Sequence, residues 1–106
     1  EFLYVDDLAD AAIFVMGLDY KTLYEKGISH LNVGSGKELT IKELVLLIAK
    51  KLKYNGKIIF DKSKPDGMPR KLMDSSKLER LGWVHKTTID KGIEIAYEEF
   101  VKKHVQ

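Results

Sequence analysis

The residues best suited to chemistry lie in one stretch, residues 61–74, with the sequence DKSKPDGMPRKLMD. Its Pro-Asp-Gly at positions 65–67 predicts a tight turn, because proline presets φ, aspartate bonds its own backbone and glycine accepts positive φ. A second proline then restricts the direction in which Arg70 and Lys71 leave the turn. Arg70 and Lys71 would neutralise phosphates, and Asp66 would accept hydrogen bonds from hydroxyl or ring N–H groups. A nucleotide sugar has these parts; the alternative is a solvated turn between a strand and a helix.

Other sets of reactive residues are incomplete in this sequence. The histidines, His30, His85 and His104, are far apart and have no carboxylate at ligand spacing, so we expect no metal site. The Gly-Ser-Gly at positions 34–36 lacks the third glycine of a dinucleotide fingerprint, which favours a structural turn over a phosphate loop. No Tyr-x-x-x-Lys pair occurs. We therefore expect no catalytic residue within this chain.

The composition is that of an ordinary globular domain. Hydrophobic residues make up 44% and charged residues 32%, which excludes disordered and fibrous classes. The net charge is only +2, so nucleic acid is not an expected partner. The absence of cysteine fits a reducing compartment, and no apolar run reaches the roughly 20 residues that span a membrane. We expect a soluble, cytoplasmic domain with no membrane partner.

The elements that would position the 61–74 loop alternate between strands and helices. Strands are expected at residues 2–5, 28–33 and 57–61, where β-branched and aromatic residues gather. The chain starts without methionine inside the first of these, so we expect it to be a piece of a longer protein. The predicted fold class is α/β, in the order β-α-β-α-β-α-α.

Four helices are expected from the helical spacing of apolar residues and from capping residues. Asp6 and Asp7 would supply an N-cap and a favourable negative charge in the first turn of a helix from about 7 to 18, and an exposed connection would follow at 19–27. Thr40 and Glu43 form a capping box for the next helix, which ends before Tyr54-Asn55-Gly56.

The last two helices follow the 61–74 loop. Ser75 or Ser76 would cap a short helix that Gly82 ends, with Trp83 anchoring it to the core. Thr87 and Asp90 would begin a C-terminal helix running to about residue 103. Its expected buried stripe is Ile89, Ile93, Ala96, Tyr97 and Phe100.

Three stretches together resemble the C-terminal part of extended short-chain dehydrogenase/reductases (the NAD-dependent epimerase/dehydratase family) that act on nucleotide sugars. They are FLYVDDLADA at 2–11, HLNVGSG at 30–36 with the TIKEL that begins the next helix, and DSSKLERLGW at 74–83. The SKPDGMPRK at 63–71 is similar to the branch of epimerase-reductases that make GDP-L-fucose or a related GDP-deoxyhexose. The resemblance covers essentially the whole chain.

This resemblance implies a small C-terminal substrate-binding domain of an extended Rossmann-type enzyme, over residues 1–106. It implies that Asp66 contacts the GDP-sugar substrate, that Lys71 lies near the diphosphate, and that Arg70 is a second such cation. NADP(H) and the Ser-Tyr-Lys catalytic residues belong to the preceding Rossmann domain, so this chain alone is expected to bind no cofactor and to be inactive. The complete enzyme would be a homodimer that epimerises carbons 3 and 5 of a keto sugar and then reduces carbon 4 with NADPH.

Two alternatives stay open. The first is another nucleotide-sugar epimerase or dehydratase of the same superfamily. The second is a free-standing binding module for RNA or protein, in which Lys50, Lys51, Lys53 and Lys57 would hold RNA. Interleaved acids and the lack of an aromatic platform disfavour RNA.

Overall fold

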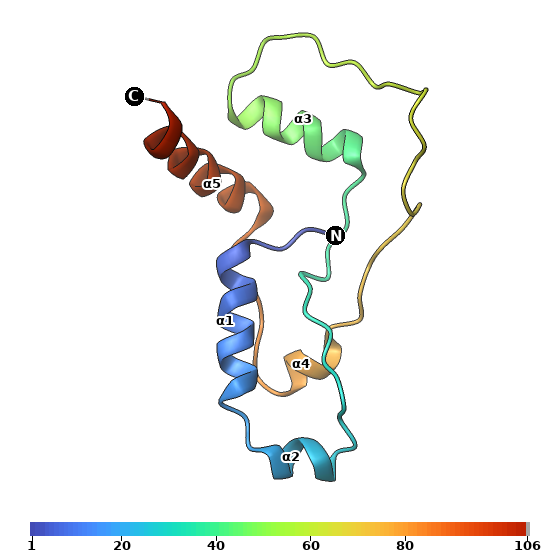
Figure 1. The fold of residues 1–106 in the computed structure, drawn as a ribbon, viewed down its shortest axis with the longest axis vertical. Helices are drawn as coiled ribbons and strands as arrows, with labels where there is room; N and C mark the ends of the chain where they lie inside the picture. The colour runs from blue at the N-terminus through green and yellow to red at the C-terminus, as the bar shows by residue number, and fades with distance from the viewer. Residues whose placement is uncertain (106) are drawn as a thin grey trace.

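Five helices follow one another in the computed structural model, which describes residues 1–105 (Figure 1). They are α1 (Val5–Met16), α2 (Tyr20–Glu25), α3 (Ile41–Lys51), α4 (Ser76–Arg80) and α5 (Ile89–His104). Within the described residues no strand is present, so the predicted β-α-β-α-β-α-α order is wrong in its strands.

The reason lies in the partners that a strand needs. A strand exists only where its backbone N–H and C=O groups bond a neighbouring strand, and local propensity does not supply that neighbour. Segment 2–5 leads into α1, whose first residue is Val5, and segments 28–33 and 57–61 connect helices; none of the three forms such a ladder. Their β-branched and aromatic residues therefore shape the connections but build no sheet.

α1 begins two residues earlier than expected, at Val5, with Tyr4 as its N-cap. The predicted N-cap role of Asp6 and Asp7 is wrong, because both lie inside the first turn, but the predicted negative charge in that turn is confirmed. Asp7 is buried and its carboxylate accepts hydrogen bonds from the backbone N–H (2.8 Å) and the hydroxyl (3.2 Å) of Thr87. A carboxylate committed to a residue 80 positions away cannot also cap its own helix.

α2 occupies the region expected to be a connection. Asp19 caps it by accepting from the Lys21 N–H, and the Tyr20 and Tyr24 rings stack with centroids 6.0 Å apart. A local cap and an i, i+4 aromatic pair support a short helix where no apolar stripe runs.

α3 has the predicted capping box. The Thr40 hydroxyl oxygen accepts from the Glu43 N–H (3.1 Å), and the Glu43 carboxylate accepts from the Thr40 N–H (2.8 Å). The hydrogen bonds that the Glu43 carboxylate accepts from Thr40 lower the pKa of Glu43, the Thr40 backbone N–H being the largest cause. The capping box is confirmed because all of its partners lie within one turn.

α4 and α5 follow their sequence signals in part. Ser75 occupies the N-cap position of α4, but its side chain makes no cap hydrogen bond. Gly82 has φ of 109°, as a left-handed terminator of α4 requires, and Trp83 is 5% exposed. α5 starts after Thr88, whose side chain accepts from the Lys91 N–H. The predicted role of Thr87 as the cap is wrong, since Thr87 is bound to Asp7 instead.

The core is very small. Ala11, Leu78 and Trp83 are buried, and Phe14, Val15, Leu31 and Val33 pack against them. The predicted buried stripe of α5 is wrong as stated: Ile89 and Ile93 are half-buried, and Ala96, Tyr97 and Phe100 are exposed. Beyond this cluster, α3 lies against α5, joined by Lys51, whose ammonium contacts Asp90 (3.1 Å) and Glu94 (2.9 Å).

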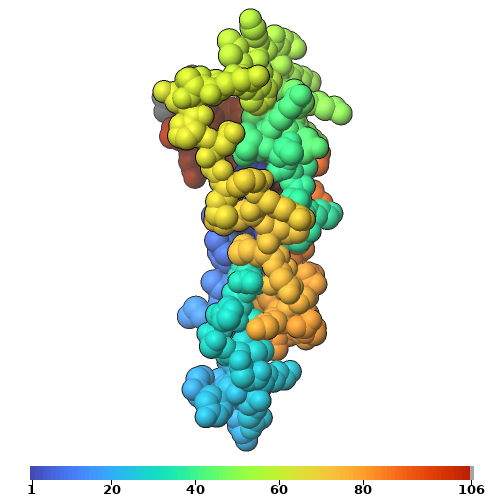
Figure 2. All heavy atoms as spheres, turned by 90° about the vertical axis from the view of Figure 1, so that its right-hand side faces the viewer, coloured from blue at the N-terminus to red at the C-terminus, as the bar shows by residue number. Residues whose placement is uncertain are grey.

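The described chain is elongated and open, with extents of 54 × 36 × 18 Å (Figures 1 and 2). Its radius of gyration is 17.5 Å, against about 13 Å for a compact domain of this length. Its accessible surface is 8753 Å², against about 6,000 Å² for a compact protein of this mass. Much apolar surface therefore has no cover within these residues.

Candidate functional site

The 61–74 loop lies at the surface and swings away from the helices on its way from α3 to α4 (Figure 1). Every residue of this loop is exposed. In Figure 2 its atoms, in yellow and gold, face the viewer along one side of the molecule. The loop is therefore free to meet a ligand or another protein surface.

Short turns fix both ends of the loop. Asp61 accepts from the hydroxyl (2.6 Å) and the backbone N–H (2.9 Å) of Ser63, and these bonds lower the pKa of Asp61. At the other end, Asp74 accepts from the Ser76 N–H (3.0 Å), and hydrogen bonding from Ser76 lowers the pKa of Asp74. Both carboxylates stay charged over a wider acidic range than a free aspartate, so these turns persist at mildly acidic pH.

Arg70 is held by an acid from outside the loop. Its Nε lies 3.0 Å from Oε1 and 2.9 Å from Oε2 of Glu38, in the segment that leads into α3. The pair is exposed, at 72% for the Arg70 side chain and 42% for Glu38. The contact fixes the guanidinium relative to the Gly-Ser-Gly turn at 34–36.

A second carboxylate holds the exit of the loop. Glu1 accepts from the Gly36 N–H (2.8 Å) through Oε1 and from the Met73 N–H (3.0 Å) through Oε2. The Glu1 carboxylate passes so close to Gly34 that a Cβ there would lie 2.5 Å from Oε1. A side chain at Gly34 would displace the Glu1 carboxylate from this position, so glycine leaves room for the bridge as it is seen here.

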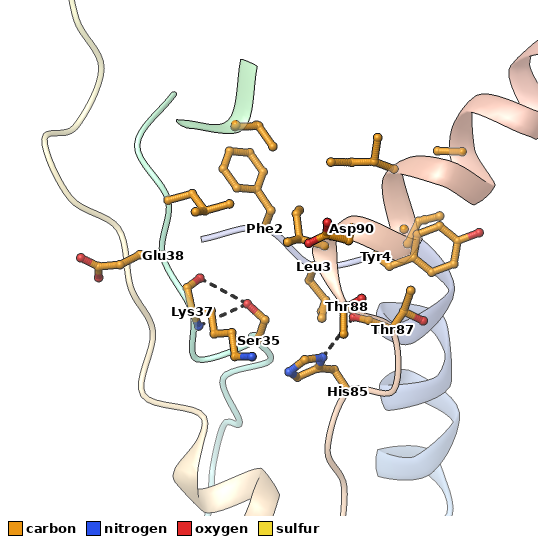
Figure 3. A pocket seen from close by; sticks show the side chains of 17 residues that line it. Phe2, Leu3, Tyr4, Ser35, Lys37, Glu38, His85, Thr87, Thr88 and Asp90 are labelled. Atoms are coloured by element: carbon orange, nitrogen blue, oxygen red, sulfur yellow. Dashed lines mark hydrogen bonds between the residues drawn. The ribbon is translucent and has the colours of Figure 1, made fainter. Parts of the chain in front are cut away.

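An apolar cleft of about 890 Å³ opens beside these contacts (Figure 3). Its apolar walls come from the N-terminal segment, the chain entering α3, and α5; they include Phe2, Leu3, Leu39, Leu44, Ile89 and Ile93. Its polar rim includes Ser35, Lys37 and His85, with the His85 Nδ1 3.2 Å from the Thr87 carbonyl oxygen. Glu38 lines this cleft and also binds Arg70, so it joins the cleft to the loop.

The structure keeps the three predicted site residues on one loop but does not bring their side chains together. Among the contacts of residues 1–105, neither Asp66 nor Lys71 has a side-chain hydrogen bond or ion pair, whereas Arg70 is bound to Glu38. Sequence reasoning missed Glu38 and Glu1. No local spacing could reveal them, because they lie 32 and 72 positions from their partners Arg70 and Met73.

The lysine face considered for RNA is only partly free, because Lys51 is bound to Asp90 and Glu94. These carboxylates raise the pKa of Lys51, with Glu94 the larger cause. Across residues 1–105 no group of three or more metal-binding side chains is gathered, and no helix there is long and apolar enough to cross a membrane.

No protein-family model matches the chain. Among curated proteins, it is 49% identical over 106 residues to putative GDP-L-fucose synthase 2 of Arabidopsis thaliana, covering 100% of this chain and 30% of that protein. It is 46% identical over 105 residues to GDP-L-fucose synthase of Escherichia coli (strain K12), covering 96% of this chain and 33% of that protein.

The chain is also similar to solved structures of enzymes named for GDP-sugars. A GDP-6-OMe-4-keto-L-xylo-heptose reductase from C. jejuni matches with a TM-score of 0.82 at 38% identity, covering 93% of this chain and 30% of that one. A GDP-mannoheptose C4 reductase from Campylobacter jejuni, solved with NADP bound, matches with a TM-score of 0.73 at 40% identity, covering 90% and 29%. The matched region is the C-terminal part of such enzymes. The chain spans roughly 30% of the length of each relative.

Proposed function

Because this chain is a homologue of GDP-L-fucose synthases over roughly 30% of their length, we propose that it is the GDP-sugar-binding part of a longer NADP-dependent epimerase-reductase. The reaction removes and returns protons at carbons 3 and 5 of GDP-4-keto-6-deoxymannose. A hydride from NADPH then adds to carbon 4, and its oxygen takes up a proton. In this proposal the preceding part of the enzyme holds NADP(H) and the catalytic groups.

The role of this chain is to hold the substrate. Lys71 and Arg70 bind the diphosphate, and Asp66 accepts hydrogen bonds from the nucleoside. A diphosphate held in this way keeps the sugar within reach of catalytic groups on the preceding part, so that binding energy is converted into orientation. No step of the chemistry is assigned to the described residues.

The observation that carries the proposal is a match at 49% identity that runs through the whole chain, the 61–74 loop included. The exposure of every residue of this loop adds physical support, because charged side chains at the surface can meet a phosphate without rearrangement of a core. Two tethers, Glu1 to Met73 and Glu38 to Arg70, further limit the positions that the cations can take.

The test is steady-state kinetics of Lys71→Ala in the full-length enzyme, with GDP-4-keto-6-deoxymannose and NADPH. A cation on the diphosphate is felt equally in the ground and transition states, so KM is expected to rise while kcat changes less. Loss of one charge-assisted hydrogen bond corresponds to about ten- to a hundredfold in kcat/KM.

Lys64→Ala is the matched control, since Lys64 lies in the same exposed loop before the Pro-Asp-Gly turn. Its KM is expected to stay at the wild-type value. An unchanged KM in a folded Lys71→Ala enzyme, with circular dichroism as the folding check, would remove Lys71 from the substrate site.

A second candidate substrate is a GDP-heptose, favoured by the structural matches to two GDP-heptose reductases at 38% and 40% identity. The higher identity of 46–49% to GDP-L-fucose synthases favours the deoxyhexose. Assay of the full-length enzyme with both GDP-keto sugars decides between them, because the preferred substrate has the larger kcat/KM.

A further inference from the structure

The contact between Glu38 and Arg70 uses only one edge of the guanidinium. Both short distances, 3.0 and 2.9 Å, start from Nε. A guanidinium has five N–H donors, and Nε carries one of them. Among residues 1–105 no hydrogen bond uses the four donors on the two Nη atoms of Arg70. The free edge of Arg70 is therefore the pair of NH₂ groups, which is able to bind a planar or tetrahedral oxyanion.

Stability does not account for this ion pair. Exposed pairs add little to folding stability, and these two side chains are 72% and 42% exposed. Orientation does account for it. An arginine side chain has many rotamers, and a ligand that must order it loses affinity. A carboxylate that already holds Nε removes part of that cost before the ligand arrives.

The surroundings of the pair support the same role. The Glu1 bridge fixes the backbone three residues after Arg70, at Met73, to Gly36. Glu38 comes two residues after Gly36, so the side-chain contact and the backbone contact join the same two segments. Arg70 is thus held both through its backbone and through Nε.

From this geometry we infer that Glu38 is a positioning residue, which holds Arg70 by Nε and presents its two NH₂ groups to the diphosphate of the substrate. The inference rests on the proposed function. Glu38 itself touches no phosphate, because its negative charge would repel one. Its favourable effect on binding passes through Arg70, so the effect of Glu38→Ala on KM depends on whether Arg70 is present, which would not hold for a merely structural residue.

The experiment is a double-mutant cycle of Glu38→Ala and Arg70→Ala in the full-length enzyme, read as KM and kcat for the GDP-sugar. Glu38→Ala is expected to raise KM about two- to tenfold, because the ligand must then order the flexible Arg70 side chain itself. The value of kcat is expected to change little. Glu38→Gln keeps an oxygen acceptor for Nε, so its KM is expected to lie between those of the wild-type enzyme and Glu38→Ala. In the Arg70→Ala background, Glu38→Ala is expected to leave KM unchanged or to lower it, since only repulsion remains to be removed.

Glu98→Ala, an exposed glutamate on α5, is the matched control and is expected to leave KM unchanged. If Arg70→Ala raises KM but Glu38→Ala does not, Arg70 binds substrate and the positioning role of Glu38 is wrong. The same conclusion follows if Glu38→Ala raises KM equally with and without Arg70. If neither variant nor Lys71→Ala changes KM, the proposed function itself fails. Where turnover is too slow to measure, the Kd of GDP for the same variants replaces KM in this comparison.

Discussion

At the scale of single residues, carboxylates organise this chain. Asp7 binds Thr87, Asp10 accepts from the Trp83 indole N–H (2.9 Å) and Lys86 (3.2 Å), and Glu1 bridges two loops. The indole contact is the largest cause that lowers the pKa of Asp10. Within residues 1–105 the buried apolar residues are Ala11, Leu78 and Trp83, which is little core, so these directed bonds fix the path of the N-terminal part relative to the C-terminal part.

We expect Asp7→Ala to destabilise the chain, because the half-buried N–H of Thr87 would lose its acceptor. The cost of such an orphaned group is about 1–3 kcal/mol. Asp6→Ala is the matched control, since Asp6 is exposed on the same turn of α1, and it is expected to change stability by less than about 0.5 kcal/mol. Urea unfolding followed by circular dichroism measures both, and equal destabilisation by the two variants would contradict the role of Asp7.

At the scale of elements, prediction from sequence succeeded where the determinants are local. The capping box of Thr40 and Glu43 and the left-handed Gly82 were predicted because their partners lie within a few residues. The strands failed because pairing needs a distant neighbour, and Glu38 and Glu1 were missed for the same reason. Asp66, Arg70 and Lys71 remain predictions as substrate ligands, since residue types alone do not determine what an exposed loop binds.

The start of α3 is expected to depend on pH through Glu43. Its pKa is lowered in the folded chain, so its contribution is complete above the pKa of an unfolded glutamate and is lost as pH falls through the lowered folded value. Two-dimensional NMR titration of the Thr40 amide should therefore show one transition below the usual glutamate range. Glu43→Gln should abolish that transition, and a Thr40 transition that survives this substitution would assign it to another group.

At the scale of the whole molecule, exposed apolar surface is the main feature. The accessible surface exceeds that of a compact protein of this mass by about 2,700 Å². Large apolar side chains are exposed on four helices, among them Ile13 and Met16 on α1, Tyr20 on α2, Ile41 on α3 and Phe100 on α5. Surface of this extent and kind favours association.

We expect the isolated chain to self-associate, because another copy can cover apolar surface that these residues leave open. Sedimentation velocity over a wide concentration range should show a mass that rises with concentration. The full-length enzyme is the comparison, and in the proposal its preceding part covers this surface. A chain that stays monomeric at high concentration would show that the exposed side chains are too dispersed to form an interface.

The long exposed connection between α3 and α4 has one more consequence, for proteases. Exposed backbone outside helices is the preferred place for proteolytic nicking, and residues 61–74 offer lysines and an arginine to a trypsin-like enzyme. A cut there severs the chain but none of the bonds that join Asp7 to Thr87, Asp10 to Trp83 and Lys51 to Glu94. The two pieces should therefore stay together as a nicked complex that separates only under denaturing conditions. Two separately produced peptides that correspond to these pieces should reassemble into the same complex.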